Sequence, residues 1–570
     1  MSEDALTAIW SIAQLTHYSG VRDIVTAQFQ VLTNGDLLHE VFDHFYVRPR
    51  GIDCSWSIPA PESKHLLWAG LVCKAFYEPA MDVLWRFMDS WTAFLRLIPT
   101  ISLENLGSVF VSYSGASDFT ANLIKTKTTT GVMTESGMQR LLAYTRRVRS
   151  LTIKKFYQSV STHIYFFMTQ FCRTDTLFPA LASLFIPELS ELSCDNFNAL
   201  YLPTASNLSY LRIGKITTER EIVAASVLSH NLLAARSLRV LCLSGKLTQA
   251  TFDLLVGLKK LEVIALYIKE TIFTADLLEI FSQLMSLKTL TIELANNSRI
   301  ASIPTSPVIF ESLRDVSLGG PANNVYNFLQ SVRFVHLDSL SLDFFADSLV
   351  PYIQSCLSRC SELGVLSSLT FFKVDKVSNP EVALVELESS VVLHSCKNLE
   401  YLDIPVISMT KSTIRDRFRH CQLLETLQLR CHQLPANDSG LSLYDLREFA
   451  EHFKNLETLS ISLANILASP DDIQLLEACL TDPLAWAGHD LENLEILPIT
   501  TKATHLPDTT KKYTYKEAIL VSQYIDSLFP RLKKLVFPTP TNPWVEEVKA
   551  LLTAYQAVRK RESLKKCYEI

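Results

Sequence analysis

A short apolar pattern that returns along most of the chain is the feature that most restricts its fold. The pattern is an apolar residue, two residues of any kind, a second apolar residue, one of any kind and a third apolar residue. It occurs about fourteen times after residue 147, at separations of roughly 23 to 38 residues. A period of this length is one supersecondary unit that buries its apolar face only by stacking on its neighbours, so the pattern predicts a repeat array. The instances are Val148-Leu151-Ile153, Leu181-Leu184-Ile186, Leu208-Leu211-Ile213, Leu238-Leu241-Leu243, Leu261-Ile264-Leu266, Leu287-Leu290-Ile292, Leu313-Val316-Leu318, Leu337-Leu340-Leu342, Leu366-Leu369-Phe371, Leu399-Leu402-Ile404, Leu424-Leu427-Leu429, Leu456-Leu459-Ile461, Leu494-Leu497-Ile499 and Leu532-Leu535-Phe537.

The spacing inside each instance predicts a strand. Its last two apolar positions are two residues apart, so in an extended chain both side chains point to the same face. Between the strands the period changes to that of a helix, as in "LYDLREFAEHF", where Leu446, Phe449, Ala450 and Phe453 lie on one side. We therefore expect an α/β solenoid with parallel strands on one face and helices on the other.

Two proline-containing segments indicate where helices begin. Ser469-Pro470-Asp471-Asp472 provides an N-cap, a proline at the first helical position and acids near the positive end of the helix dipole. Asn542-Pro543 has the same arrangement before "WVEEVKALLTAY". This last helix places Val545, Val548, Leu551, Leu552 and Tyr555 on one side, and we expect it to cap the C-terminal end of the array.

The segments "CKNLEYLDI" and "CQLLETLQL" relate the array to a known family. Each places a cysteine, Cys396 or Cys421, three residues before the first leucine of its instance. In this the chain resembles the irregular, cysteine-containing leucine-rich repeats found downstream of F-boxes. It differs from common leucine-rich repeats because the asparagine expected three residues after the last apolar position is mostly missing.

Two apolar helical segments precede the array. The first is "DLLHEVFDHF", residues 36–45. The second begins at Leu66 and Leu67 and includes "GLVCKAFYEPAMDVLWR", residues 70–86. A polar, proline-containing insertion that ends near Ser63 separates them. Pro79 interrupts the second segment and suits the first turn of a further helix. A unit of about 50 residues is too small to bury all of these apolar side chains, so a neighbour must cover some of them.

These two segments resemble the F-box, most closely its fungal form. The matching residues are Leu37, Leu38, Glu40, Val41 and Phe42, then Gly70 to Lys74, Phe76, Pro79, Ala80 and Leu84 to Arg86, whereas Asn34-Gly35-Asp36 stands where the family has leucine-proline. The resemblance implies a helical surface that binds a Skp-type adaptor, which joins the chain to a cullin–RING ubiquitin ligase. The adaptor-binding residues that it implies are Leu37, Leu38, Val41, Phe42, Phe45, Leu71, Val72, Phe76, Pro79, Leu84 and Trp85. The alternative is that "GLVCKAFYEP" is the buried N-terminal cap of the solenoid.

Together these features predict four parts. Residues 1–29 form an N-terminal helical extension, 30–90 an F-box-like adaptor-binding domain, 91–144 a linker with the first irregular coil, and 145–570 the solenoid with its C-terminal helix. The resemblance implies a substrate-recognition subunit of a Skp–cullin–F-box ligase that binds a target protein through its repeats. The alternative is a leucine-rich-repeat interaction scaffold without ligase association.

No motif for enzymatic chemistry is evident, so we expect a non-catalytic protein without cofactor or metal. Glycine-rich phosphate loops, H-E-x-x-H and G-x-S-x-G are all missing. We considered a metal site at His420-Cys421 with Cys431-His432, His394 and Cys396, but the spacing fits no established zinc module. Packing of these cysteines in the coil interior is the preferred interpretation.

Charge and cysteine usage restrict the partners and the compartment. A net charge of −6 over 570 residues provides no concentrated basic face, so we expect neither nucleic-acid nor membrane binding. Twelve scattered cysteines and an acidic start without a signal-peptide pattern predict an intracellular protein, cytoplasmic or nuclear, with reduced thiols. The terminal "RKRESLKK" fits a solvated helix end or a nuclear signal. Tyr267, Phe344 and Phe345 fit either a target-binding face or the core.

Overall fold

A computed structural model of the chain divides into two compact units, residues Met1–Gly245 and Lys246–Ile570, which we describe separately. The structure describes the backbone of residues 32, 34–44, 63–89, 92–98, 101–109, 124–131, 134–153, 158–160, 162–171, 176–192, 200, 206–234, 237–268, 272–295, 299–300, 306–345, 350–374, 395–406, 418, 420–431, 441–463, 470–481, 489–497, 514–537 and 543–568. The predicted N-terminal extension, residues 1–29, and the insertion before Ser63 lie outside these ranges.

In the described part of the first unit, helices precede a parallel sheet whose strands pair in the order β1-β4-β6-β7-β8. A second sheet in this unit has the order β2-β3-β5. The elements are α3 (Gly35–Asp43), α4 (Ser63–Val72), α5 (Lys74–Arg86), β1 (Phe87–Met88), α6 (Thr92–Leu95), β2 (Ile101–Val109), β3 (Ile124–Gly131), α7 (Glu135–Thr145), β4 (Ser150–Thr152), β5 (Gln158–Val160), α8 (Thr162–Phe171), β6 (Ser183–Ile186), η2 (Leu189–Glu191), β7 (Tyr210–Ile216), η4 (Thr218–Arg220), α10 (Glu221–Ala234) and β8 (Val240–Gly245).

The second unit continues the same strand–helix alternation, and its main strands pair in the order β9-β11-β14-β16-β17-β18-β19-β20-β21-β22. Two small parallel pairs, β10-β12 and β13-β15, accompany them. The elements are α11 (Gln249–Asp253), η5 (Leu254–Gly257), β9 (Val263–Ile268), β10 (Ile272–Phe273), α12 (Ala275–Ser282), β11 (Thr289–Leu294), β12 (Arg299–Ile300), β13 (Val308–Phe310), β14 (Asp315–Gly320), α13 (Ala322–Ser331), β15 (Val332–Phe334), β16 (Ser339–Phe344), α14 (Val350–Glu362), η6 (Leu366–Ser368), β17 (Leu369–Val374), β18 (Tyr401–Val406), β19 (Thr426–Cys431), η8 (Leu443–Asp445), α17 (Leu446–His452), β20 (Thr458–Ser462), α18 (Pro470–Thr481), β21 (Asn493–Leu497), α19 (Tyr515–Leu528), β22 (Lys534–Val536) and α20 (Pro543–Tyr568).

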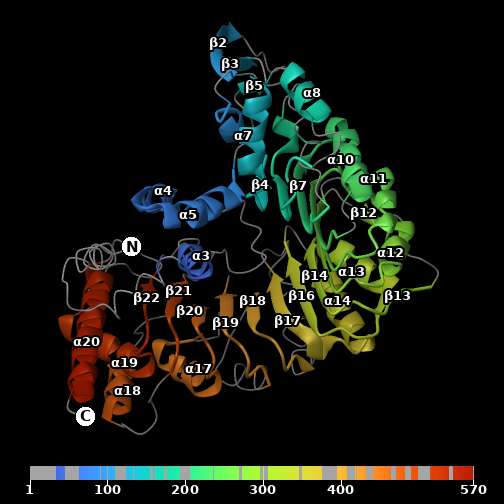
Figure 1. Cartoon of the computed structure of the whole chain (residues 1–570). Coiled ribbons are helices and arrows are strands. Elements are labelled where there is room, and N and C mark those ends of the chain that lie inside the picture. The colour runs from blue at the N-terminus through green and yellow to red at the C-terminus, as the bar shows by residue number, and fades with distance from the viewer. Residues whose placement is uncertain are drawn as a thin grey trace, which may run out of the picture. The chain divides into compact units, whose positions relative to one another are not determined.

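The predicted leucines form the core of this solenoid-like arrangement. Leu290 and Ile292 of β11, for example, are at most 1% exposed and lie beside Ile264 and Leu266 of β9 in register. Within each compact unit, the strands of the main sheet pair in parallel with the strand of the next repeat, and helices α12, α13 and α14 follow the strands along one side (Figure 1). The α/β fold with a large parallel repeat sheet is therefore confirmed.

The register of two repeats differs from the prediction. In β17, Phe372 rather than Phe371 is buried, because a bulge inserts one residue where Leu340 pairs with Leu369 but Ser341 pairs with Phe371. In β21, Leu494 pairs with Leu459 and is 1% exposed, so the buried set is Leu491, Leu494 and Ile496 instead of Leu494, Leu497 and Ile499. Both stretches contain apolar residues in two overlapping frames, and packing against the neighbouring strand selects one.

At the C-terminal ends of the strands in three repeats, one residue has a positive φ. Lys215, Gly245 and Gly320 each stand two residues after the last apolar position of a repeat and have φ of 51°, 134° and 143°. Gly245 pairs with Ile216, the residue after Lys215, and the register of the β7–β8 pair shifts between Ile213 and Ile216. Glycine is favoured at such positions because it lacks the Cβ that opposes positive φ.

The C-terminal helices confirm two predicted starts. α18 begins at Pro470 and α20 at Pro543. Trp544, Val545, Val548 and Leu552 of α20 are 5% exposed or less, and this helix packs against α19. Within the described ranges, no helix is long and apolar enough to cross a membrane.

Candidate docking surface on the N-terminal helices

Helices α3, α4 and α5 share a small core of their own. Leu38 and Phe42 of α3, Leu66 of α4, and Ala80 and Val83 of α5 are at most 5% exposed and pack together. Ala69, Ala75, Phe76 and Leu84 pack against them while remaining partly exposed. The rings of Phe42 and Phe76 meet edge to face with their centroids 5.7 Å apart, a favourable aromatic geometry.

Polar contacts fix α3 against α5. The Asn34 side chain caps α3 by accepting hydrogen bonds from the backbone N–H of Asp36 at 3.0 Å and of Leu37 at 3.3 Å. Arg86 Nη1 lies 2.6 Å from Asp43 Oδ1, joining the last turns of the two helices.

His39 adds a second link between these helices. Its Nε2 lies 2.9 Å from Asp82 Oδ2 and its Nδ1 lies 2.7 Å from the Gly35 carbonyl oxygen. Both partners are acceptors, so both ring nitrogens donate when the imidazole is protonated. The hydrogen bond to Asp82 accordingly raises the pKa of His39, although partial burial opposes the shift.

The outward faces of α3 and α4 are apolar and exposed. On α3, Leu37 and Val41 are 45% and 53% exposed, one helical turn apart. On α4 the exposed fractions are 45% for Leu67, 57% for Trp68, 72% for Leu71 and 66% for Val72. Large exposed apolar groups on two helices that both pack on α5 are typical of a surface that binds another macromolecule. We call these six residues the apolar docking surface.

The structure divides the predicted adaptor-binding residues into three groups. Leu37, Val41, Leu71 and Val72 are exposed, whereas Leu38, Phe42 and Pro79 are buried. Phe76, Leu84 and Trp85 are half-buried, and Phe45 lies outside the described residues. Leu67 and Trp68 were not among the predicted adaptor-binding residues. Because α4 is apolar around most of its circumference, the spacing of its apolar residues does not distinguish the exposed face from the buried one.

Trp85 packs toward the first repeat. Its ring centroid lies 4.6 Å from that of Tyr144 and 5.7 Å from that of Phe94. Phe94 in turn meets Phe178 edge to face at 5.5 Å. This aromatic row joins α5 to the solenoid inside the first unit.

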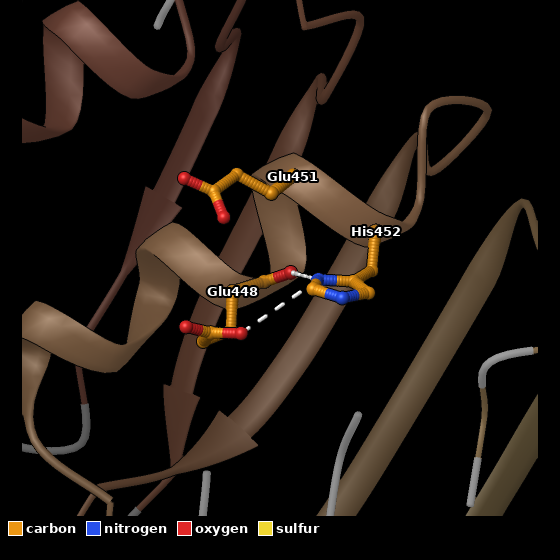
Figure 2. Close-up of side chains that lie close together, drawn as sticks. All are labelled: Glu448, Glu451 and His452. Atoms are coloured by element: carbon orange, nitrogen blue, oxygen red, sulfur yellow. Dashed lines mark hydrogen bonds and ion pairs between the residues drawn. The ribbon is translucent and has the colours of Figure 1, made fainter. Parts of the chain in front are cut away.

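The second unit contains one group of potential metal ligands among the described residues, formed by Glu448, Glu451 and His452 of α17, whose ligand atoms lie within 4.8 Å of one another (Figure 2). His452 Nδ1 lies 2.9 Å from the Glu448 carbonyl oxygen and 3.7 Å from its carboxylate. Glu451 pairs with Arg447 at 2.7 Å. Contacts within the helix therefore account for this arrangement, and we assign it no metal.

The cysteine and aromatic candidates of the repeats lie mostly in the interior. Cys396 and Cys421 are 0% exposed, and the Cys421 thiol donates to the Cys396 carbonyl oxygen at 3.5 Å. His420 is exposed. His394 and His432 lie outside the described residues, and only the backbone of Cys431 is described. Phe344 is buried in the core, and Tyr267 and Phe345 are half-buried.

No protein-family model and no curated protein matches the chain. Among solved structures, the Toll–Spatzle complex, described as a molecular hub in Drosophila development and innate immunity, matches with 12% sequence identity and a TM-score of 0.24. The match covers 66% of this chain and 55% of that one. So low a TM-score supports no argument about fold or function.

Proposed function

We propose that the chain is the substrate-recognition subunit of a Skp–cullin–F-box ubiquitin ligase, with the N-terminal helices binding the adaptor and the repeats binding a target protein. The observation that carries the proposal is the apolar docking surface, above all Leu71 and Val72, on a three-helix unit whose own core is already filled. Such helix faces bind partners through aromatic and aliphatic anchors that become buried in the complex.

In this function the chain does no bond chemistry itself. It holds a target near the ubiquitin-loaded enzyme of the ligase, which raises the effective concentration of the target's lysines. The buried residues Leu38 and Phe42 act by shaping the unit, and the exposed residues make the contact.

The test is binding of a purified Skp-type adaptor to the full chain, measured by calorimetry. Val41→Glu combined with Leu71→Glu should weaken binding by about 30-fold or more, since central anchors contribute about 2 kcal/mol or more. Ile222→Glu on α10 is the matched control, because Ile222 is an apolar residue 79% exposed in the same unit. Circular dichroism of each variant shows whether the fold is retained.

Absence of adaptor binding by the wild-type chain at micromolar concentration would contradict the proposal. That result would favour the repeat scaffold without ligase association. If wild type and the double variant bind the adaptor equally well, the adaptor does not bind at the apolar docking surface.

A further inference from the structure

The contacts between α5 and the first repeat point to a further role within the proposed function, the positioning of the adaptor-binding helices. We propose that Arg147 clamps α5 onto the first repeat, so that the apolar docking surface and the solenoid of the first unit move as one rigid body. The clamp itself does not depend on the proposed function, but its consequence for ubiquitin transfer does.

The chain leaves no flexible connection at this point. α5 ends at Arg86 and β1 begins at the next residue, Phe87. β1 pairs in parallel with β4, with Phe87 opposite Ser150, and the Arg149 N–H donates to the Arg86 carbonyl oxygen at 2.9 Å. The last turn of α5 therefore continues directly into the repeat sheet.

Arg147 reinforces this junction from the repeat side. It stands between α7 and β4, and its guanidinium forms ion pairs with Glu78 and Asp82, which lie one turn apart on α5. Its Nη1 also donates to the Glu78 carbonyl oxygen at 3.3 Å. The Arg147 and Asp82 side chains are 19% and 37% exposed, so this pair is more strongly held than an ordinary surface pair, whereas Glu78 is 63% exposed.

Asp82 extends the clamp to α3. One of its carboxylate oxygens pairs with Arg147, and the other lies 2.9 Å from His39 of α3. A single carboxylate thus connects α3, the helix that carries Leu37 and Val41, with Arg147 in the connection between α7 and β4. Trp85 of α5 also packs on Tyr144 of α7, so an aromatic contact to α7 supports the polar contact to Arg147, which follows that helix.

Rigidity matters because a flexible junction spreads the bound target over a larger volume and lowers its effective concentration at the ligase. A fixed junction restricts which lysines come within reach. Arg147 is in this sense a positioning residue, which contacts neither adaptor nor target.

The test measures the distance from the helices to the repeats in the full chain without any partner. Spin labels on unnatural ketone residues at Lys74 of α5 and Ile222 of α10, both exposed, avoid the twelve native cysteines. Pulsed dipolar spectroscopy should give one narrow distance for wild type and a broadened or displaced distribution for Arg147→Ala. Arg146→Ala is the matched control, since Arg146 is exposed and adjacent and should leave the distribution unchanged.

Arg147→Lys keeps the charge but cannot bind two carboxylates in a planar fork, so it should give an intermediate distribution in a chain that folds. A wild-type distribution as broad as that of Arg147→Ala, or an Arg147→Ala distribution identical to wild type, would overturn the inference. In a reconstituted ligase, Arg147→Ala should retain adaptor affinity while ubiquitin spreads to more lysines of the repeats themselves, which stand in for the bound target in this assay. If no adaptor binds, the proposed function is wrong. The distance measurement still shows whether Arg147 fixes α5 to the first repeat.

Discussion

Replacing Gly320 with alanine should destabilise the second unit locally and strongly. Gly320 ends β14 with φ of +143°, and a Cβ built there lies 2.7 Å from the Leu294 carbonyl oxygen and 3.2 Å from the Leu294 Cβ. The oxygen belongs to the backbone of β11 and cannot move without disturbing that strand. A backbone nearly restricted to glycine costs an L-residue about 1–3 kcal/mol. Overpacking against the strand adds about 1–3 kcal/mol, so we expect a total near 3 kcal/mol or above.

Gly364→Ala is the matched control within the same unit. Gly364 also has positive φ, +71°, but a Cβ there meets nothing within 4 Å. Its substitution should cost only the left-handed strain of about 1–2 kcal/mol. The contact with Leu294 is thus the main difference between the two variants.

Hydrogen exchange of amides in β14 and β16 is the suitable assay, because a chain with two compact units need not unfold in one transition. A difference of about 2 kcal/mol between the two variants corresponds to roughly 30-fold faster exchange in Gly320→Ala. Equal protection in the two variants would refute the argument that close approach to Leu294 requires glycine at this strand exit.

Three further predictions concern titration, reactivity and register. Since the pKa of His39 is raised above its usual 6.5, the link between α3 and α5 should be fully present below pH 6.5 and be lost as pH rises through the folded pKa. Exchange of α3 amides from pH 6 to 8 checks this, and the dependence should disappear in His39→Gln. Burial raises the pKa of Cys360 and Cys396 to about 12. In the folded chain at pH 8, iodoacetamide should therefore modify the exposed Cys73 but not these two thiols. Peptide mass spectrometry identifies the modified cysteines. Phe372→Ala should cost about 3–5 kcal/mol of local stability, and the half-buried Phe371→Ala clearly less; a reversed order in hydrogen exchange of β17 would contradict the assigned register.

The repeat strands were predictable because their burial follows the simplest periodicity in the chain. Leu427 and Leu429 of β19, for example, are at most 1% exposed and lie opposite Leu402 and Ile404 in register. The pattern does not reveal a bulge, since an inserted residue such as Thr370 changes the partner of each later residue without changing the composition. The misplaced position at Phe371 follows from this, and the resulting stack of Phe371 on Tyr401, with centroids 4.3 Å apart, is a tertiary contact.

The hairpin of β2 and β3 was missed for a different reason. Residues 91–144 were interpreted as linker and irregular coil, yet Ile101 pairs with Gly131 and Leu103 with Thr129 in an antiparallel register. Most of β3, "IKTKTTTG", is polar, so no apolar alternation indicates a strand. Its β-branched threonines were the available signal, and that preference depends strongly on context.

The docking surface was only partly predictable because α3 carries two apolar stripes. Leu38 and Phe42 are one turn apart, and so are Leu37 and Val41, which puts the two pairs about 100° apart around the helix. Both stripes satisfy the same periodicity, and only the packing of Ala80 and Val83 from α5 determines which one is buried. A residue list from the sequence therefore combines the side chains that build the unit with those left for a partner. The separation matters for function, because substitution of the inner stripe tests folding and substitution of the outer stripe tests binding.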